Sequence, residues 1–381
     1  MSAVFFDHNS TTALKTEVLK AMLPFMTQQH GNASSRHSYG RVARAAIEQA
    51  REQVATAVNA HPSQVVFTAS GTEANNFAIR GMTSNFSGGQ ILTSAVEHPC
   101  VSGPALALRS PTLQANRIKV DVNCRLDLNH LHKLLDAPTQ LVSVMLANNE
   151  TGVVQDITAI SEIARTHKAF MHTDAVQGLG KIVVDFEVLN VHAMTISSHK
   201  IGGPLGAGAL VLDKRVDIKP LLYGGGQEKG LRSGTENISA IVGFGVACEM
   251  AVKNLVQFEQ HTQLLRDYLE TGLTKLNAHL FSNHANRLPN TSFFAFEHID
   301  GETLVMALDR KGFAIASGSA CSSDNGEPSH VLLAMAVNED LARSAIRVSF
   351  GTSNTITQVQ QFLTVLENEL ARLRNLTAMA V

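Results

Sequence analysis

The chain contains 381 residues, of which 44% are hydrophobic and 17% are charged, and its net charge is -2. This length and composition predict a globular protein with a sizeable core and, as a prior, two domains. The near-neutral charge and the scattered basic residues argue against nucleic acid as a partner, because such a surface needs clustered lysine and arginine. No apolar run reaches membrane-spanning length and the start lacks a leader-like pattern, so we expect no membrane association and a cytoplasmic location.

Strand-like and helix-like segments alternate between residues 43 and 250. Apolar residues recur at helical spacing from Ala43 to Val58, and short β-branched or aromatic runs follow. The predicted strands span residues 65–68, 91–93, 118–120, 141–146, 170–173, 194–197 and 209–212. Strands separated by helical segments indicate βαβ units, so we expect an α/β protein with a mainly parallel mixed sheet flanked by helices.

The pattern changes near residue 250. Residues 239–276 predict one or two long amphipathic helices with a leucine-rich stripe. The segments that follow are an apolar run at 293–296, a helix at 304–311, strands at 313–316 and 346–349, and a closing helix through 363–370. We therefore expect a large domain of residues 15–250 and a smaller α/β domain formed by residues 1–14 and 251–381.

A carboxylate and a lysine each stand at the end of a predicted strand. Residues 170–173 run into Asp174, and residues 193–196 run into a Ser-Ser-His-Lys segment that ends at Lys200. Open α/β sheets bind ligands at the carboxyl ends of their strands. A lysine that forms a Schiff base and an acid beside a pyridine nitrogen are the groups that pyridoxal phosphate requires from a protein. The sequence therefore predicts a pyridoxal-phosphate site.

Other polar residues allow a functional and a structural interpretation. Gly71 and Thr72 open a helix after a strand, which suits an anion such as phosphate but also an ordinary N-cap. His98 follows another strand and could exchange protons beside a cofactor, although a single histidine is more often a packing residue. Arg232 and Arg347 could each hold a substrate carboxylate, although a single arginine is more often a surface residue.

Cys321 differs from the other cysteines. Cys100, Cys124, Cys248 and Cys321 form no C-x-x-C pair, which argues against a metal site or a disulfide framework. Cys100 and Cys248 have apolar neighbours, so we interpret them as packed small hydrophobic residues. Cys321 stands in a small, polar, turn-rich stretch at 316–328, so its thiol is predicted to be exposed and mobile.

Together these segments resemble the NifS/IscS-type cysteine desulfurases of the class V pyridoxal-phosphate-dependent aminotransferase family. The resemblance covers nearly the whole chain, and the sequence at 317–322 with its long following loop resembles the group I branch. Ten segments occur in the family's order: 7–12, 31–35, 70–73, 97–98, 148–150, 174–177, 197–200, 224–235, 317–322 and 346–347. The resemblance implies a fold-type I transferase with a large cofactor-binding domain and a small domain that carries the cysteine loop.

The resemblance also implies roles for individual residues. Lys200 would form the Schiff base, Asp174 would contact the pyridine nitrogen, and Gln177 would donate to the ring oxygen. The other implied residues are His98 as the stacked acid–base group; Gly71 as a cofactor contact; Thr72, Ser197, His199 and, across a homodimer interface, Thr235 as phosphate ligands; Asn149 near both cofactor and substrate; Arg347 at the substrate carboxylate; and Cys321 as the nucleophile.

The implied reaction converts L-cysteine to L-alanine. Lys200 would remove the α-proton, and Cys321 would attack the substrate sulfur to form a persulfide, since the thiolate is the reactive form of cysteine. An acceptor protein, either an iron–sulfur scaffold or a thiolation carrier, would then take the sulfur. Three alternatives stay open: a selenocysteine lyase, an aminotransferase that would not need Cys321, and a non-catalytic subunit. The last is disfavoured because Lys200, Asp174 and Cys321 are all present.

Overall fold

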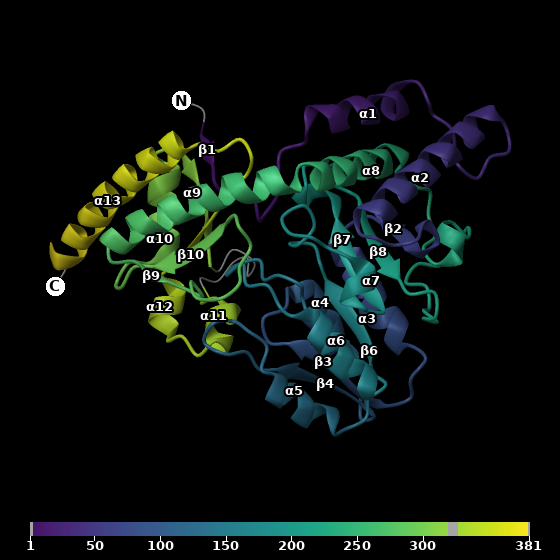
Figure 1. Ribbon diagram of the computed structural model, residues 1–381, viewed down its shortest axis with the longest axis horizontal. Helices are drawn as coiled ribbons and strands as arrows, with labels where there is room; N and C mark the ends of the chain where they lie inside the picture. Colours follow the sequence, from purple (N-terminus) through teal and green to yellow (C-terminus); the bar gives the residue numbers. More distant parts are fainter. Residues whose placement is uncertain (1–2, 319–326, 380–381) are drawn as a thin grey trace.

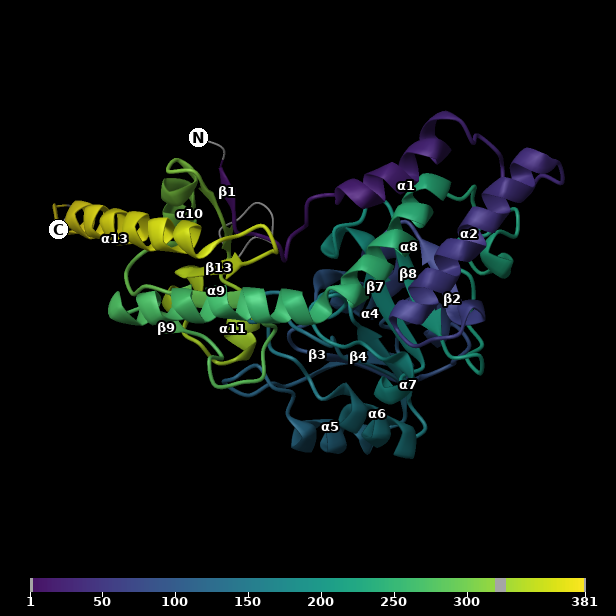
Figure 2. The same cartoon turned by 45° about the horizontal axis from the view of Figure 1, so that its top comes forward.

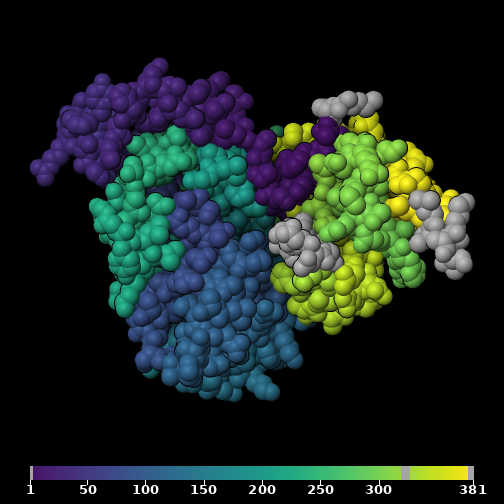
Figure 3. Space-filling view, turned by 180° about the vertical axis from the view of Figure 1, so that it is seen from behind, coloured from purple at the N-terminus to yellow at the C-terminus, as the bar shows by residue number. Residues whose placement is uncertain are grey.

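In the computed structural model, which describes residues 3–318 and 327–379, the chain forms two lobes (Figures 1 and 2). The larger lobe contains a seven-stranded sheet and the smaller lobe a four-stranded sheet. The N-terminal residues lie between the two lobes, where the space-filling view shows them in dark purple (Figure 3). The N-terminal segment is therefore placed to contact both lobes.

The large lobe is built on a mixed sheet with the strand order β2-β8-β7-β6-β5-β3-β4. The strands are β2 (Val65–Thr68), β3 (Gly89–Ser94), β4 (Leu113–Ile118), β5 (Thr139–Ser143), β6 (Phe170–Asp174), β7 (Ala193–Ser197) and β8 (Gly208–Leu212). Within this sheet β8 runs antiparallel to both of its neighbours, whereas the other pairs are parallel. The predicted mainly parallel mixed sheet is confirmed.

Helices cover both faces of this sheet. Successive side chains of a strand point to opposite faces, so the apolar strands have residues on each face for the helices to bury. In β2, Val65 and Phe67 pack on the side of α2 (Ser38–Ala57) and α8 (Ile238–Lys253), whereas Val66 packs on the side of α3 (Gly71–Thr83) and α4 (Pro99–Ala107). The helices of this lobe are α1 (Thr16–Thr27), α2 (Ser38–Ala57), α3 (Gly71–Thr83), α4 (Pro99–Ala107), α5 (Leu128–Leu135), α6 (Ile157–Thr166), α7 (Phe186–Leu189) and α8 (Ile238–Lys253). Because both faces of each central strand are covered, these strands are continuous apolar runs, and such runs predict them from the sequence.

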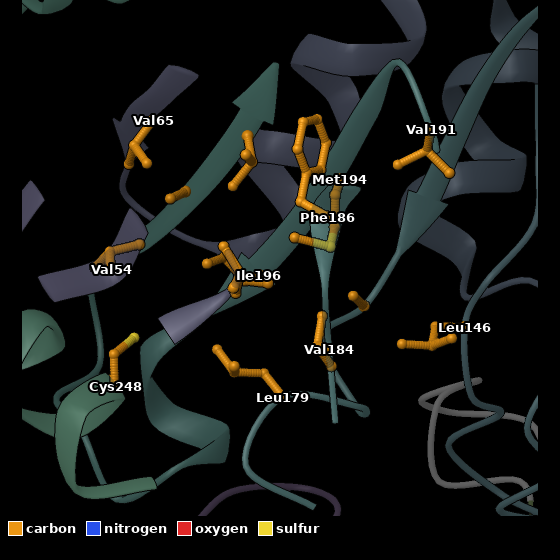
Figure 4. Close-up of a cluster of buried hydrophobic side chains, with 14 of the residues drawn as sticks. Val54, Val65, Leu146, Leu179, Val184, Phe186, Val191, Met194, Ile196 and Cys248 are labelled. Atoms are coloured by element: carbon orange, nitrogen blue, oxygen red, sulfur yellow. The ribbon is translucent and has the colours of Figure 1, made fainter. Parts of the chain in front are cut away.

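The core between the sheet and its helices contains one of the cysteines. Val54 of α2, Val65 of β2 and Ile196 of β7 belong to the same buried cluster as Cys248 of α8 (Figure 4). Cys248 has no exposed surface, and burial raises the pKa of its thiol above the ordinary range. The interpretation of Cys248 as a packed hydrophobic residue is confirmed.

The small lobe has an antiparallel sheet with the order β12-β13-β10-β9. Its strands are β9 (His279–Leu280), β10 (Thr291–Ala295), β12 (Ala316–Ser317) and β13 (Ala345–Ser349), and β1 (Val4–Phe5) pairs separately with β11 (Phe313–Ala314). Its helices are α9 (Leu255–Lys275), α10 (Gly301–Asp309), α11 (His330–Ala334), α12 (Glu339–Arg343) and α13 (Ile356–Met379). One core lies under α9, α10 and α13, and a second joins α11 and α12 to residues of the large lobe.

Three predicted strands differ from the structure. The strand predicted at 118–120 is β4, which ends at Ile118; it is an edge strand whose exposed polar middle hid it. The strand predicted at 141–146 ends at Ser143. The strand predicted at 313–316 is two short strands, β11 and β12, because the chain changes partner at Ile315 from β1 to β13.

The junction of the lobes lies at the break between α8 and α9, near the predicted change at residue 250. The two helices are bent by 70° relative to each other, and in the described part of the chain only this bent pair, and no single helix, has the length and apolar composition to cross a membrane. The division into a large domain of residues 15–250 and a small domain of residues 1–14 and 251–381 stays a prediction.

His172 provides a test of the sheet's stability. Its ring in β6 is fully buried, with Nδ1 2.8 Å from Ser143 Oγ of β5 and Nε2 3.1 Å from Thr195 Oγ1 of β7. Burial lowers the pKa of His172 from 6.5 to about 3. Below pH 6.5 His172 therefore binds a proton in the unfolded chain but not in the folded chain. The free energy of unfolding falls by up to about 1.4 kcal/mol for each pH unit until the pH approaches 3.

We expect His172→Gln to flatten the acid limb of the stability profile, measured as the free energy of urea unfolding from pH 7 to pH 4. The other buried histidines titrate in the same direction, so the comparison is between slopes rather than absolute stabilities. If the stability of the variant falls with pH as steeply as that of the wild type, the lowered pKa of His172 is contradicted.

Candidate active site

A cavity of about 210 Å³ lies at the carboxyl ends of strands in the large sheet. β2, β6 and β7 end at this edge, at Thr68, Asp174 and Ser197. The predicted site residues that line the cavity are Gly71, Thr72, His98, Asn149, Asp174, Gln177, Ser197, His199 and Lys200. Ligands of open α/β sheets bind at this edge, so the fold brings the predicted residues together where the sheet would bind a small molecule.

Lys200 closes a single 3-10 turn, η2 (Ser198–Lys200), directly after β7. Its Nζ donates to the main-chain oxygens of Asn9 and Ser10, both at 2.6 Å. The neighbouring His199 has its Nδ1 3.1 Å from Thr11 Oγ1, and burial together with Lys200 lowers its pKa to about 4. The N-terminal segment thus holds the amine of Lys200 at the cavity.

Asp174 is buried at the end of β6 and accepts two hydrogen bonds. Val176 N–H donates to Oδ1 at 3.0 Å, and the side-chain amide of Asn75 donates to Oδ2 at 2.7 Å. Burial raises the pKa of Asp174, whereas these two donors favour its carboxylate form. Sequence reasoning missed Asn75, although its position three residues after Thr72 on α3 places both on one helix face.

His98 is the N-cap of α4, and its Nδ1 accepts from the backbone N–H of Cys100 at 3.1 Å. Burial lowers the pKa of His98; Asp174 acts in the opposite direction, while Lys200 and His330 add to the lowering. The ring is therefore neutral near pH 7. Because Nδ1 accepts, the hydrogen of the neutral ring is on Nε2.

The interpretation of Cys100 as a packed hydrophobic residue is incomplete, because Cys100 packs against the core beside α3 and α4 and also lines the cavity. Its side chain lines the cavity, with Sγ 2.9 Å from His98 Nδ1 and 3.1 Å from Asn75 Nδ2. Its apolar neighbour Val101 is fully buried in the core, and Cys100 packs partly buried against the same cluster. Burial and, to a smaller extent, the negative charge of Asp174 raise the pKa of Cys100 to about 12, so this sulfur stays a thiol.

The start of α3 packs closely against two strands. Ser70 is the N-cap, and its Oγ accepts from Glu73 N–H at 3.1 Å. A Cβ at Gly208 would lie 2.6 Å from the carbonyl carbon of Ser70, and a Cβ at Gly71 would lie 3.5 Å from Ser197 Cβ. Ser197 Oγ is buried and has no hydrogen-bond partner in the described part of the chain. Ser70 therefore caps α3, and Ser197 places a hydroxyl without a hydrogen-bond partner near the N-terminus of the same helix.

Of the two candidate arginines, Arg347 is the one at the site. It is buried on β13 and donates to Asn149 O at 2.8 Å and to Asp7 Oδ1 at 2.6 Å. Its Nε is buried without a hydrogen-bond partner among residues 3–318 and 327–379. Arg232 instead forms an ion pair with Glu73 at 2.7 Å, which occupies its guanidinium.

Cys321 lies outside the described residues, but the segments on both sides of 319–326 contact the site. Ala316 of β12 pairs with Arg347 in the small sheet. After the interval, Ser329 Oγ donates to Glu150 at 2.5 Å, next to Asn149. The role of Cys321 stays a prediction.

Thr235 is exposed and does not line the cavity of its own chain. Its predicted role concerns the site of a partner subunit, so this role also stays a prediction. In the described part of the chain, no group of three or more His, Cys, Asp or Glu side chains is arranged to hold a metal ion.

Comparison with known proteins assigns the family. Residues 4–362 match the model of the family described as aminotransferase class-V. The chain is 40% identical to cysteine desulfurase IscS of Dictyoglomus turgidum, over 98% of this chain and 96% of that protein. It resembles the solved structure of a NifS-like protein with a TM-score of 0.92 and 36% identity, over 97% of this chain and 99% of that one. A structure of SspA in complex with cysteine matches with a TM-score of 0.80 and 30% identity, over 92% of this chain and 99% of that one. The chain therefore belongs to the aminotransferase class-V family and, within it, to the NifS/IscS-type cysteine desulfurases.

Proposed function

We propose that the chain converts L-cysteine to L-alanine with pyridoxal phosphate as cofactor and passes the sulfur through Cys321 to an acceptor protein. The observation that carries this proposal is that Lys200 and Asp174 line the same cavity. Arg347 donates a hydrogen bond to Asn149 in the wall of that cavity. The names of the relatives support it. An iron–sulfur scaffold or a thiolation carrier as acceptor, and a cytoplasmic location, belong to the same proposal.

The residues present fit the cofactor. Pyridoxal phosphate, when bound, would supply an aldehyde for Lys200 and a ring that withdraws electrons from the substrate. The start of α3 and the available Ser197 Oγ suit its phosphate, because a helix N-terminus favours an anion. Asp174 suits the pyridine nitrogen, because a neighbouring cation favours the carboxylate that burial disfavours.

The chain's own groups also suit the substrate. Arg347 suits a carboxylate, because its buried Nε has no hydrogen-bond partner in the described part of the chain, and Asn149, which lines the cavity, lies beside it. The Lys200 amine stands where it can take an α-proton, and neutral His98 presents a hydrogen at Nε2. Cys321 acts as the nucleophile on the substrate sulfur, supported by the contacts of both flanking segments with the site.

The proposed enzyme is a homodimer. Large apolar side chains are exposed on α1 and α2 and near the glycine-rich segment that precedes Thr235: Leu19, Leu23, Met26, Tyr39, Val42, Leu222 and Tyr223. Exposed large apolar side chains on neighbouring segments suit a contact with another protein, and a two-fold dimer would cover them with the same segments of a second copy.

Lys200 is expected to be the residue that carries the cofactor. Borohydride reduction followed by peptide mapping should find the pyridoxyl group on Lys200, and Lys200→Ala should lower alanine formation by on the order of a thousandfold or more. Lys181 is the matched alternative, because its amine also contacts Asn9. A pyridoxyl group on Lys181 would overturn the assignment.

Cys321→Ser is expected to bind the cofactor with wild-type affinity but to form alanine on the order of a thousandfold more slowly, because the thiol acts only in the chemical step. Mass spectrometry after incubation with L-cysteine should find no persulfide on this variant. Cys248→Ala, whose thiol is fully buried in the core, is the matched control and should stay active. If Cys321→Ser forms alanine at the wild-type rate, an aminotransferase or lyase mechanism replaces the proposal.

The shared site can be tested with mixed dimers of Thr235→Ala and Lys200→Ala chains, purified with two different tags. If Thr235 serves the partner's site, one site of each mixed dimer combines a native Lys200 with a native Thr235. That site should bind pyridoxal phosphate with wild-type Kd, and the mixed dimer should retain about half of the wild-type activity. A weakened Kd at the active site of the mixed dimer, equal to that of Thr235→Ala alone, would assign Thr235 to its own subunit.

A further inference from the structure

Lys181 is a buried lysine at the back of the site. Its side chain is 2% exposed, and its Nζ donates to Asn9 Oδ1 at 2.8 Å and to Gln177 Oε1 at 2.5 Å. In the described part of the chain it forms no ion pair with a carboxylate. Its two amide contacts therefore define its position.

The charges that face Lys181 from other segments are positive. Burial, followed by Lys200 after β7 and Arg347 on β13, lowers the pKa of Lys181 well below its usual value. His8 of the N-terminal segment also faces it, and burial together with Lys181 lowers the pKa of His8 to about 4. A neutral amine still has two hydrogens, so both hydrogen bonds from Lys181 persist without its charge.

The contacts of Lys181 decide which end of the Gln177 amide faces which neighbour. Gln177 Nε2 donates to the main-chain oxygen of Asn9 at 2.9 Å, while Oε1 accepts from Lys181. A rotated amide would place Oε1 against the Asn9 oxygen, acceptor against acceptor, and would lose the hydrogen bond that Lys181 donates to Oε1. The observed orientation is therefore the one that Asn9 requires and that the Lys181 hydrogen bond holds.

We propose that Lys181 is a positioning residue that fixes the Gln177 amide, so that an Nε2 hydrogen is presented to the ring oxygen of the cofactor. An amide NH₂ has two hydrogens, and Asn9 takes one of them. Gln177 lines the cavity, so the second hydrogen is available to a group bound there. This inference rests on the proposed function, because it requires pyridoxal phosphate in the site.

The test compares Lys181→Met with the wild-type holoenzyme by two readouts that do not depend on turnover. These are the Kd of pyridoxal phosphate and the pH midpoint of the bound cofactor's visible absorbance. A donor at the ring oxygen withdraws negative charge that would otherwise hold a proton on the neighbouring linkage nitrogen, so its loss raises the midpoint. With one hydrogen bond lost, we expect a rise of about one pH unit and a Kd about tenfold weaker.

Lys15→Met is the matched control, because Lys15 and Lys181 line one cavity of about 270 Å³ that adjoins Lys200. Removal of this neighbouring lysine should leave the midpoint unchanged, since in the described part of the chain Lys15 forms no hydrogen bond with Gln177. An equal shift in Lys15→Met would assign the effect to charge alone and overturn the proposal.

A double variant tests whether Lys181 acts through Gln177. In a Gln177→Leu background, Lys181→Met should add no further shift, because the amide that it positions is gone. Additive shifts, or a Lys181→Met midpoint equal to that of the wild type, would overturn the proposal. Should Lys181→Met fail to fold, Lys181→Gln carries the test, because it keeps an amide donor. Its midpoint should lie between those of the wild type and Gln177→Leu, and a midpoint beyond that of Gln177→Leu would be contrary evidence.

The outcome also separates this inference from the proposed function. A wild-type protein that binds no pyridoxal phosphate would defeat the proposed function. Normal binding by the wild type with an unshifted Lys181→Met would defeat only the role of Lys181.

Discussion

Asn9 is buried between the two lobes, and its polar groups contact both of them. Its main-chain oxygen accepts from Gln177 and Lys200, and its side-chain oxygen accepts from Lys181, all in the large lobe. Toward the small lobe, its side-chain oxygen accepts from Asn290, its amide nitrogen donates to Thr291, and its backbone N–H donates to Ser349 Oγ. Because these groups are buried, loss of one partner would leave an unsatisfied donor or acceptor. The position of the Lys200 amine thus depends on how the N-terminal segment docks between the lobes.

The parts of this structure that the sequence predicts are those in which a buried environment leaves a local pattern. β6 and β7 are buried on both faces, so their apolar runs mark them and also mark the polar residues at their ends, Asp174 and Lys200. The fold class and one edge of the cavity follow from this pattern alone. β4 escapes the same reasoning, because an edge strand with an exposed middle has no apolar run.

The remaining site residues could not be predicted because tertiary contacts define them. Cys100 and Val101 are adjacent in the sequence and both contact the same core, yet only Cys100 also lines the cavity, which depends on how α4 is rotated about its axis. Asn9 belongs to a segment that the family resemblance includes, but its role arises from partners up to 340 residues away. Lys181 follows the predicted Asp174–Gln177 segment by four residues, and only the fold shows that its amine returns to Gln177.

Burial acts on every ionisable group of this site, and the hydrogen-bond donors around each group determine what burial does to its charge. Asp174 and Glu97 are both buried carboxyls, and burial raises the pKa of each, that of Glu97 to about 8. Asp174 differs because the amine of Lys200 adds to the donors that favour its ionised form, whereas Asp174 itself disfavours ionisation of Glu97. Lys181 has positive neighbours and two amide acceptors, and a neutral amine has two hydrogens for them, so loss of its charge would not remove these contacts. Burial thus disfavours the charged form of both groups, while the donors and the Lys200 amine around Asp174 act toward its carboxylate and the positive neighbours of Lys181 act further against its charge.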